Sequence, residues 1–204
     1  MADETFLSWP FLDDRHRAHA ADLSAWCAAN ETDLHGQGDD VAADCRGLAR
    51  LLGQAGVFRH AVPAAHGGTS ERVDVRTLCL TRQTLAYHSG LADFMFAMQG
   101  LGTGAIGLFG GDAVRHAYLP AVACGDMIAG FALSEKDAGS DVAAMATTAT
   151  RVSGGWRIDG EKTWISNGQI ADVLTLFART GEPGARGISA FVFPTRTPGF
   201  SVTE

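Results

Sequence analysis

Hydrophobic residues recur at helical spacing through the first 125 residues of the chain. Leu48 and Leu52, for example, lie one turn apart on the same side of a predicted helix. We expect Asp74 to cap the third helix and Pro120 to end the last one. The segment 91–109 has little charge on any side, which predicts a buried helix. The predicted helices cover 13–29, 40–52, 74–89, 91–109 and 112–120.

After about residue 126 the pattern changes to short apolar runs separated by turn residues, which is typical of β-strands. The pair Gly154-Gly155 predicts a tight hairpin. Helices followed by an antiparallel sheet indicate an α+β chain with a helical domain at 1–125 and a β-domain at 126–204. The predicted strands cover 127–134, 147–152, 156–165, 173–179, 187–193 and 200–202.

Charge and cysteine usage exclude several classes of protein. A formal net charge of −7 argues against a nucleic-acid partner, and no apolar run is long enough to span a membrane. His16 and His19 are spaced i, i+3, which we interpret as a solvated helix side and not as a metal site. The cysteines are far apart and form no C-x-x-C pair, which predicts buried reduced thiols in a cytoplasmic protein. They are Cys27, Cys45, Cys79 and Cys124.

Two short segments carry the candidate chemistry. The first is Phe-Ala-Leu-Ser-Glu-Lys-Asp-Ala-Gly-Ser-Asp at 131–141, and the second is Gly-Glu-Lys-Thr-Trp-Ile-Ser-Asn-Gly at 160–168. Each places hydroxyl and backbone donors beside apolar or aromatic residues at the end of a strand-like run. This combination suits a flat, partly polar ring whose edge is hydrogen-bonded and whose face is covered.

Both segments resemble the flavin-binding motifs of the acyl-CoA dehydrogenase family, in the same order and at the same separation. The resemblance implies an N-terminal all-helical domain followed by an antiparallel β-barrel or sandwich-like middle domain. The family's C-terminal four-helix bundle has no counterpart in these 204 residues. We therefore expect the middle domain to be incomplete at its C-terminal end.

The resemblance also implies an activity. It is the FAD-dependent α,β-dehydrogenation of an acyl-CoA thioester to the 2-enoyl-CoA, in fatty acid metabolism. Electron-transfer flavoprotein is the implied electron acceptor, and the implied assembly is a homodimer, a homotetramer or a complex with a chain that supplies the missing bundle. The family's catalytic glutamate lies beyond residue 204, so we expect no catalytic residue here and no activity from this chain alone. The alternatives are an oxygen-using relative, such as an acyl-CoA oxidase or a flavin monooxygenase-like enzyme, and a non-catalytic binding or scaffold chain.

The resemblance assigns roles to individual residues. Ser134 corresponds to the hydroxyl at the pyrimidine edge of the flavin, Trp164 to the ring packed on the isoalloxazine, and Ser166 to the hydroxyl near N5. Gln99 and Leu101 match positions near the acyl tunnel, and Ser140 lies where cofactor and substrate approach each other. The full set of implied cofactor residues is Phe131, Leu133, Ser134, Gly139, Ser140, Trp164, Ile165 and Ser166.

The residues alone leave simpler roles open. Ser134 could cap its own loop, Trp164 could be sheet core, and Arg179 suits a solvent-facing position as well as a functional one. The turn at Gly139 and Ser140 permits a positive φ and a close approach of the backbone to a ligand, and the simpler alternative is a plain surface turn. Asp141 fits the cap of a turn better than it fits chemistry, and Glu135 belongs to the loop and is not expected to act as the base.

Overall fold

The computed structural model describes residues 4–35 and 38–203. The chain forms two compact units. One contains the residues up to Ala97 together with 123–126, and the other contains 98–122 together with the residues from Met127 onward. The sequence predicted a single boundary near Gly125, whereas 98–122 group with the strands.

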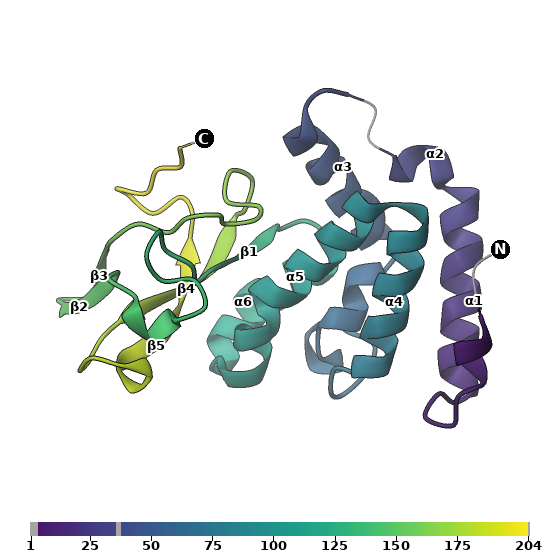
Figure 1. The fold of residues 1–204 in the computed structure, drawn as a ribbon, viewed down its shortest axis with the longest axis horizontal. Helices are drawn as coiled ribbons and strands as arrows, with labels where there is room; N and C mark the ends of the chain where they lie inside the picture. Colours follow the sequence, from purple (N-terminus) through teal and green to yellow (C-terminus); the bar gives the residue numbers. More distant parts are fainter. Residues whose placement is uncertain (1–3, 36–37, 204) are drawn as a thin grey trace. The chain divides into compact units, whose positions relative to one another are not determined.

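The first unit is helical, as predicted. Asp74 is the N-cap of α4 and accepts a 3.1 Å hydrogen bond from the backbone N–H of Arg76, which confirms the predicted cap. Asp40 caps α3 in the same way, through the backbone N–H of Ala43 at 3.0 Å. Figure 1 shows the helices α1 (Asp14–Ala29), α2 (Glu31–Leu34), α3 (Val41–Gln54) and α4 (Val75–His88), with two short 3-10 turns between α3 and α4.

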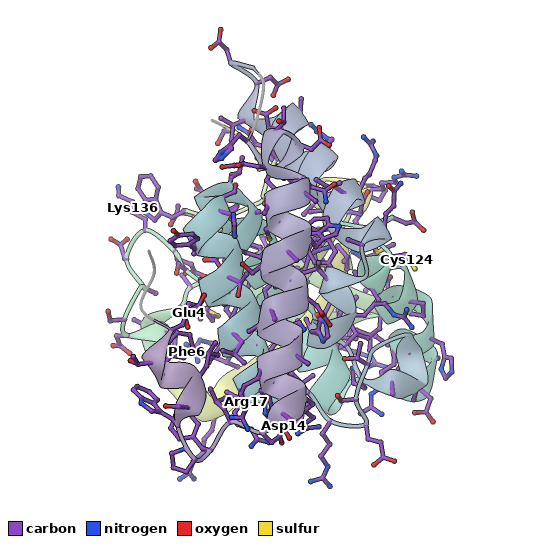
Figure 2. All side chains as sticks on the ribbon, turned by 90° about the vertical axis from the view of Figure 1, so that its right-hand side faces the viewer. Glu4, Phe6, Asp14, Arg17, Cys124 and Lys136 are labelled. Atoms are coloured by element: carbon purple, nitrogen blue, oxygen red, sulfur yellow. The ribbon has the colours of Figure 1, made fainter. Side chains whose placement is uncertain are left out.

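The beginning of α1 is tied to the segment that precedes it. Figure 2 shows Asp14 and Arg17 at the same end of this helix, and their side chains form a 2.9 Å ion pair. Arg17 Nη1 also donates to the carbonyl oxygens of Leu7 at 3.0 Å and Leu12 at 2.7 Å. One side chain therefore satisfies two backbone acceptors in the approach to the helix.

The prediction of a solvated side at His16 and His19 was wrong. His16 is fully buried, and its Nδ1 accepts the backbone N–H of Asp13 at 3.1 Å. Its Nε2 lies 2.8 Å from Asp74 Oδ2, and His19 Nε2 lies 2.8 Å from Thr81 Oγ1. Both histidines face α4 because α1 packs along that helix. Their side-chain hydrogen bonds therefore join α1 to α4 and its N-cap.

Two further helices follow. α5 (Gly90–Phe109) confirms the predicted helix, but its final two residues are not buried, since Leu108 is 72% exposed and Phe109 is 84% exposed. α6 (Asp112–Ala123) continues past Pro120, which was expected to end it. A proline inside a helix removes one backbone hydrogen bond, and here the remaining turn still forms.

The strands form one mixed, open sheet of β1 (Ala129–Ala132), β2 (Thr148–Val152), β3 (Gly155–Asp159), β4 (Val173–Arg179) and β5 (Ile188–Pro194) (Figure 1). β4 pairs in parallel with β1 and antiparallel with β5. β2 and β3 form the predicted hairpin, and β2 meets β4 in parallel at Thr148 and Arg179. The expected antiparallel barrel or sandwich was therefore wrong in both strand direction and closure. The chain between β1 and β4 is long enough to permit the parallel pairing that a hairpin cannot make.

Two predicted strands do not form as expected. The strand expected at 156–165 ends at Asp159, and 200–202 forms no strand among the described residues. The remaining part of 156–165 contains Gly160 with φ 151° and Trp164 with φ 59°, neither of which is compatible with a regular strand. The second candidate motif is therefore a loop and not a strand end.

The sheet has a buried core on each side of β4. Leu174 and Leu176 pack with Ala132 and Ala149 on one side, while Val173 packs with Ala129 on the other. The Thr175 hydroxyl donates a 2.7 Å hydrogen bond to the carbonyl oxygen of Gly102 in α5. This bond joins the helix to the middle strand.

The four cysteines are free thiols and differ in burial. Cys27 and Cys45 are buried as predicted, whereas Cys79 and Cys124 are exposed. None of the helices in the described ranges has the length and apolar character needed to cross a membrane. Within the same ranges, no three His, Cys, Asp or Glu side chains gather closely enough to hold a metal ion.

Candidate functional site

The first motif lies in the loop between β1 and β2, which both pair with the same edge of β4. β5 covers the other edge of β4 along its whole length, so β1 and β2 share the remaining edge. β1 ends where Ala132 pairs with Leu176, and β2 begins where Thr148 pairs with Arg179. Residues 133–147 leave the sheet and return to the same edge only three positions further along β4.

The second motif lies beside β1 and runs in the opposite direction. The backbone N–H of Thr163 donates a 3.0 Å hydrogen bond to the carbonyl oxygen of Ser134. At the other end of this contact, Asn167 Nδ2 donates to the carbonyl oxygen of Ala129 at 3.2 Å. The structure therefore brings the two motifs together.

Trp164 projects away from the protein. Its side chain is 92% exposed, and its φ of 59° is in the left-handed region, which is rare for a bulky residue. The next residue, Ile165, packs against the core around Leu174 and Leu176, so the chain turns the two neighbouring side chains in opposite directions. Trp164 is not sheet core. Its ring is free to cover a flat ligand, and the strained backbone is of a kind that clusters at ligand sites.

Three serine hydroxyls in the motifs are candidates for ligand contact. Within the described part of the chain, the side chains of Ser134, Ser140 and Ser166 have no hydrogen-bond partner. Ser134 and Ser166 are half-buried, whereas Ser140 is exposed. The simpler role of Ser134, as a cap of its own loop, is therefore not observed. Half-buried hydroxyls without partners are available to a ligand.

The glycine that shapes this site is Gly160 and not Gly139. Gly139 has no positive φ, and a Cβ added there would meet no atom within 4 Å, so the expected special conformation is absent. Gly160 has φ 151°, and an added Cβ would lie 2.5 Å from Thr147 Oγ1. Only glycine allows the second motif to begin this close to Thr147.

Phe131 and Leu133 lie in and just after β1. The ring of Phe131 is tilted against that of Phe177, with 5.0 Å between the centroids, and both Phe131 and Leu133 are half-buried. Packing within the sheet accounts for these contacts. A flavin contact by either side chain stays a prediction.

The two residues assigned to the acyl tunnel differ in their surroundings. Gln99 is fully buried, its Nε2 donates to the carbonyl oxygen of Met127 at 2.9 Å, and its Oε1 accepts the N–H of Ala129 at 2.6 Å. The amide thus holds the beginning of β1. Leu101 is 49% exposed on α5. The substrate contacts predicted for both residues stay predictions.

Three carboxylates in or near the motifs are engaged by the protein, whereas Asp137 and Glu161 are exposed to solvent. Asp141 accepts the N–H of Ala143 at 3.1 Å, which confirms the predicted cap, and Asp172 accepts the N–H of Ile128 at 2.9 Å. Glu135 forms a 2.8 Å ion pair with Lys162. Burial would raise the pKa of Glu135, but the hydrogen bonds from Lys162 and from nearby N–H groups outweigh burial and lower this pKa to about 2. A carboxylate held in this way is too weak a base to remove a proton from carbon.

Arg179 has a structural role that the sequence did not reveal. Its Nη2 donates to the carbonyl oxygens of Ala143 at 2.7 Å and Met145 at 3.1 Å. Its Nη1 donates to those of Gly184 at 3.0 Å and Glu182 at 3.1 Å. The guanidinium therefore joins the end of the first motif loop to the turn after β4, and neither the solvent-facing role nor a direct functional role is observed.

Sequence reasoning also missed the partnership of Glu135 with Lys162. Glu135 was placed in the loop without a partner, and Lys162 was not considered. The sequence carried no clear signal for this pair, because the first motif contains four charged residues and the second contains two. Which of them are buried depends on the folded chain.

Comparison with known proteins identifies matches over both units. The model of the acyl-CoA dehydrogenase N-terminal domain matches residues 13–126, and that of the middle domain matches 130–204. Glutaryl-CoA dehydrogenase of Desulfococcus multivorans is 34% identical over 76% of this chain and 41% of its own length. Benzylmalonyl-CoA dehydrogenase of Aromatoleum aromaticum is 37% identical over 80% of this chain and 43% of its own length.

The fold is similar to that of a solved enzyme. The structure of a glutaryl-CoA dehydrogenase from Mycobacterium smegmatis in complex with FADH2 superposes with a TM-score of 0.79 and 29% identity. This match covers 93% of the present chain and 48% of the other. The chain thus spans less than half the length of each of these relatives.

Proposed function

Because this chain belongs to the acyl-CoA dehydrogenase family, we propose that it carries the flavin-binding part of an enzyme that converts an acyl-CoA thioester to the 2-enoyl-CoA. The cofactor in this proposal is FAD. When bound, FAD accepts a hydride from the β-carbon of the acyl group, while a base removes the α-proton.

One observation carries the proposal. The two motifs lie side by side through the bond between Thr163 and Ser134, and the exposed Trp164 follows Thr163 directly. The hydroxyls of Ser134 and Ser166, one in each motif, have no partner among the described residues. A flat heteroaromatic ring needs one covering surface and donors at its edge. These residues therefore fit the isoalloxazine of FAD, and they are not needed for the protein's own packing.

The residues of this chain would divide the work of holding the ring. Trp164 covers one face and keeps water away from it. Ser134 and Ser166 donate hydrogen bonds to the polar edge of the ring, which fixes its orientation. Ser140, which is exposed near the end of the first motif, would contact the acyl-CoA.

The base comes from outside residues 1–204 in this proposal. Glu135, Asp141 and Asp172 are each engaged by backbone or side-chain donors. Removal of an α-proton needs a carboxylate that is free, positioned and shielded from water. A further polypeptide segment, in this protein or in a partner chain, would supply that carboxylate.

The remaining proposals rest on family membership. We propose electron-transfer flavoprotein as the electron acceptor, a cytoplasmic location, a role in fatty acid metabolism and a homodimeric or homotetrameric assembly. Sedimentation of the flavin-bound protein would test the assembly, and steady reduction of electron-transfer flavoprotein would test the acceptor.

The proposed function is tested by FAD titration followed by anaerobic addition of acyl-CoA. Expected results are saturable FAD binding by this chain and flavin bleaching only when the catalytic segment is present. Rapid peroxide formation in air would favour the oxygen-using alternative. Absence of FAD binding would favour a scaffold and contradict the proposal.

A further inference from the structure

A buried ion pair connects the two motifs. Lys162 Nζ lies 2.8 Å from Glu135 Oε1, and the two side chains are only 8% and 9% exposed. Lysine and glutamate are among the residues that are least often buried. Their burial costs several kcal/mol per ion unless each charge is well paired and hydrogen-bonded, so the geometry of the pair is tightly constrained.

Each charge has further partners in the backbone. Lys162 Nζ donates to the carbonyl oxygen of Leu133 at 2.9 Å. Glu135 Oε2 accepts the N–H of Ala146 at 2.6 Å, and Oε1 accepts the N–H of Thr147 at 3.0 Å. The pair thus joins the end of β1, the turn of the first motif, the approach to β2 and the beginning of the second motif.

Two of the residues expected to contact the flavin, Ser134 and Trp164, lie next to this network in the chain. Ser134 sits between Leu133 and Glu135, whose carbonyl and carboxylate are both bound by Lys162. Trp164 is two residues after Lys162 and has the strained φ of 59°. Such backbone strain persists only where neighbouring contacts enforce it.

We propose that Glu135 and Lys162 are positioning residues that hold the Ser134 hydroxyl and the Trp164 ring in one fixed arrangement for a flavin. The identity of the ligand rests on the proposed function, whereas the positioning itself does not. The pair acts through Ser134 and Trp164 and does not touch the reacting atoms.

The variants Glu135→Gln and Lys162→Met each remove one charge and leave the other buried. Lys162→Arg keeps the charge and several donors, and it serves as the conservative rescue. Glu135→Leu combined with Lys162→Met removes both charges and keeps the site folded if a single variant does not fold. Arg82→Gln is the matched control, because it breaks the 2.8 Å ion pair between Arg82 and Asp93 in the helical unit.

Two measurements are made on every variant. The first is the Kd for FAD, followed through the flavin absorption band. The second is amide hydrogen exchange in the ligand-free chain at Thr163, Ala146 and Thr147, compared with exchange at core amides of β4. Global destabilisation raises exchange at all these sites together, whereas lost positioning raises it only at the first three.

We expect Glu135→Gln, Lys162→Met and the double variant to raise exchange at Thr163, Ala146 and Thr147 by at least about tenfold, with little change in β4. We expect the Kd for FAD to rise by at least about tenfold, which corresponds to about 1.4 kcal/mol. Lys162→Arg should recover most of both values, and Arg82→Gln should alter neither.

The inference is overturned if exchange at the three amides stays at the wild-type value, or rises only in step with β4. It is also overturned if the wild-type chain binds FAD and the variants show faster exchange but the same Kd for FAD as the wild-type chain. If the wild-type chain does not bind FAD, the proposed function fails, and the exchange measurement alone decides whether the pair positions the motifs.

Discussion

The backbone N–H of Thr163 donates a 3.0 Å hydrogen bond to the carbonyl oxygen of Ser134, although 28 residues separate them in the chain. The bond places the residue before Trp164 next to a serine whose hydroxyl has no partner within the described chain. Both candidate flavin contacts are thereby held by the backbone, and their side chains remain free. Substitutions of these side chains should change ligand binding more than stability.

We expect Trp164→Ala to weaken FAD binding more than Trp156→Ala does. Trp164 is 92% exposed and contributes little to packing, whereas Trp156 packs edge-on against Phe191 at 5.5 Å and lies under Arg151. Loss of the covering ring should cost about 1–3 kcal/mol of binding, or about 5- to 150-fold in Kd. Trp156→Ala should instead lower the free energy of unfolding. Equal FAD occupancy in the two variants, at equal folded fraction, would contradict the assignment of Trp164.

Ser134→Ala and Ser166→Ala should each shift the flavin reduction potential, or slow reduction by substrate in a form that contains the catalytic segment, without loss of stability. Neither hydroxyl has a partner within the described residues, so its removal leaves no protein group unsatisfied. A hydrogen bond of this kind contributes about 0.5–1.5 kcal/mol, which sets the expected size of the effect. Potentiometry and urea unfolding measure the two quantities. An unchanged potential together with an unchanged reduction rate would show that the hydroxyls do not contact the flavin.

Local sequence signals predicted the helices well. The cap at Asp74 and the strand 173–179 were placed correctly, because both depend on neighbours in the chain. Pro120 was misread as a helix end, because the loss of one backbone hydrogen bond does not prevent the helix from continuing to Ala123. His16 was assigned to solvent because helical spacing alone does not say which neighbour a helix side meets.

The sheet and the site depended on longer-range contacts. No local pattern distinguishes the parallel pairing of β1 with β4 from an antiparallel one, because a buried strand has the same apolar residues in either case. The motifs identified Ser134, Trp164 and Ser166, whose roles stay predictions. The burial of Lys162 with Glu135 and the four carbonyl partners of Arg179 required the folded chain.

Gln99→Met should destabilise the protein because it removes the partners of two backbone groups. The carbonyl oxygen of Met127 and the N–H of Ala129 would lose their bonds to the buried amide, at a cost of about 1–3 kcal/mol. Leu101→Ala is the control, since this side chain is 49% exposed. Urea unfolding measures both variants. If Gln99→Met keeps wild-type stability and instead raises KM for the acyl-CoA in a form that contains the catalytic segment, the side chain contacts substrate as first predicted.

Stability should fall as the pH decreases from about 6.5 toward 4, because of His60. Burial, with a smaller contribution from the nearby His19 and Arg59, lowers the pKa of His60 from 6.5 to about 4. The unfolded chain therefore takes up this proton more readily, so the contribution is complete above pH 6.5 and is lost as the pH falls. We expect a loss of about 1–2 kcal/mol by pH 4.5 in urea unfolding. His60→Asn should flatten this dependence, and the exposed His35→Asn should leave it intact.

Residues 1–204 alone should bind FAD without being reduced by acyl-CoA. The α-proton of a thioester is weakly acidic, so its removal needs a free carboxylate in a site shielded from water. Glu135 cannot serve, because its carboxylate is bound by Lys162 and by two backbone N–H groups, which hold its pKa at about 2. The measurement is anaerobic bleaching of the flavin by an acyl-CoA. This chain is compared, at equal flavin content, with a longer form or with a complex that contains the helical bundle and its glutamate. Bleaching of both at similar rates would show that the base lies within this sequence.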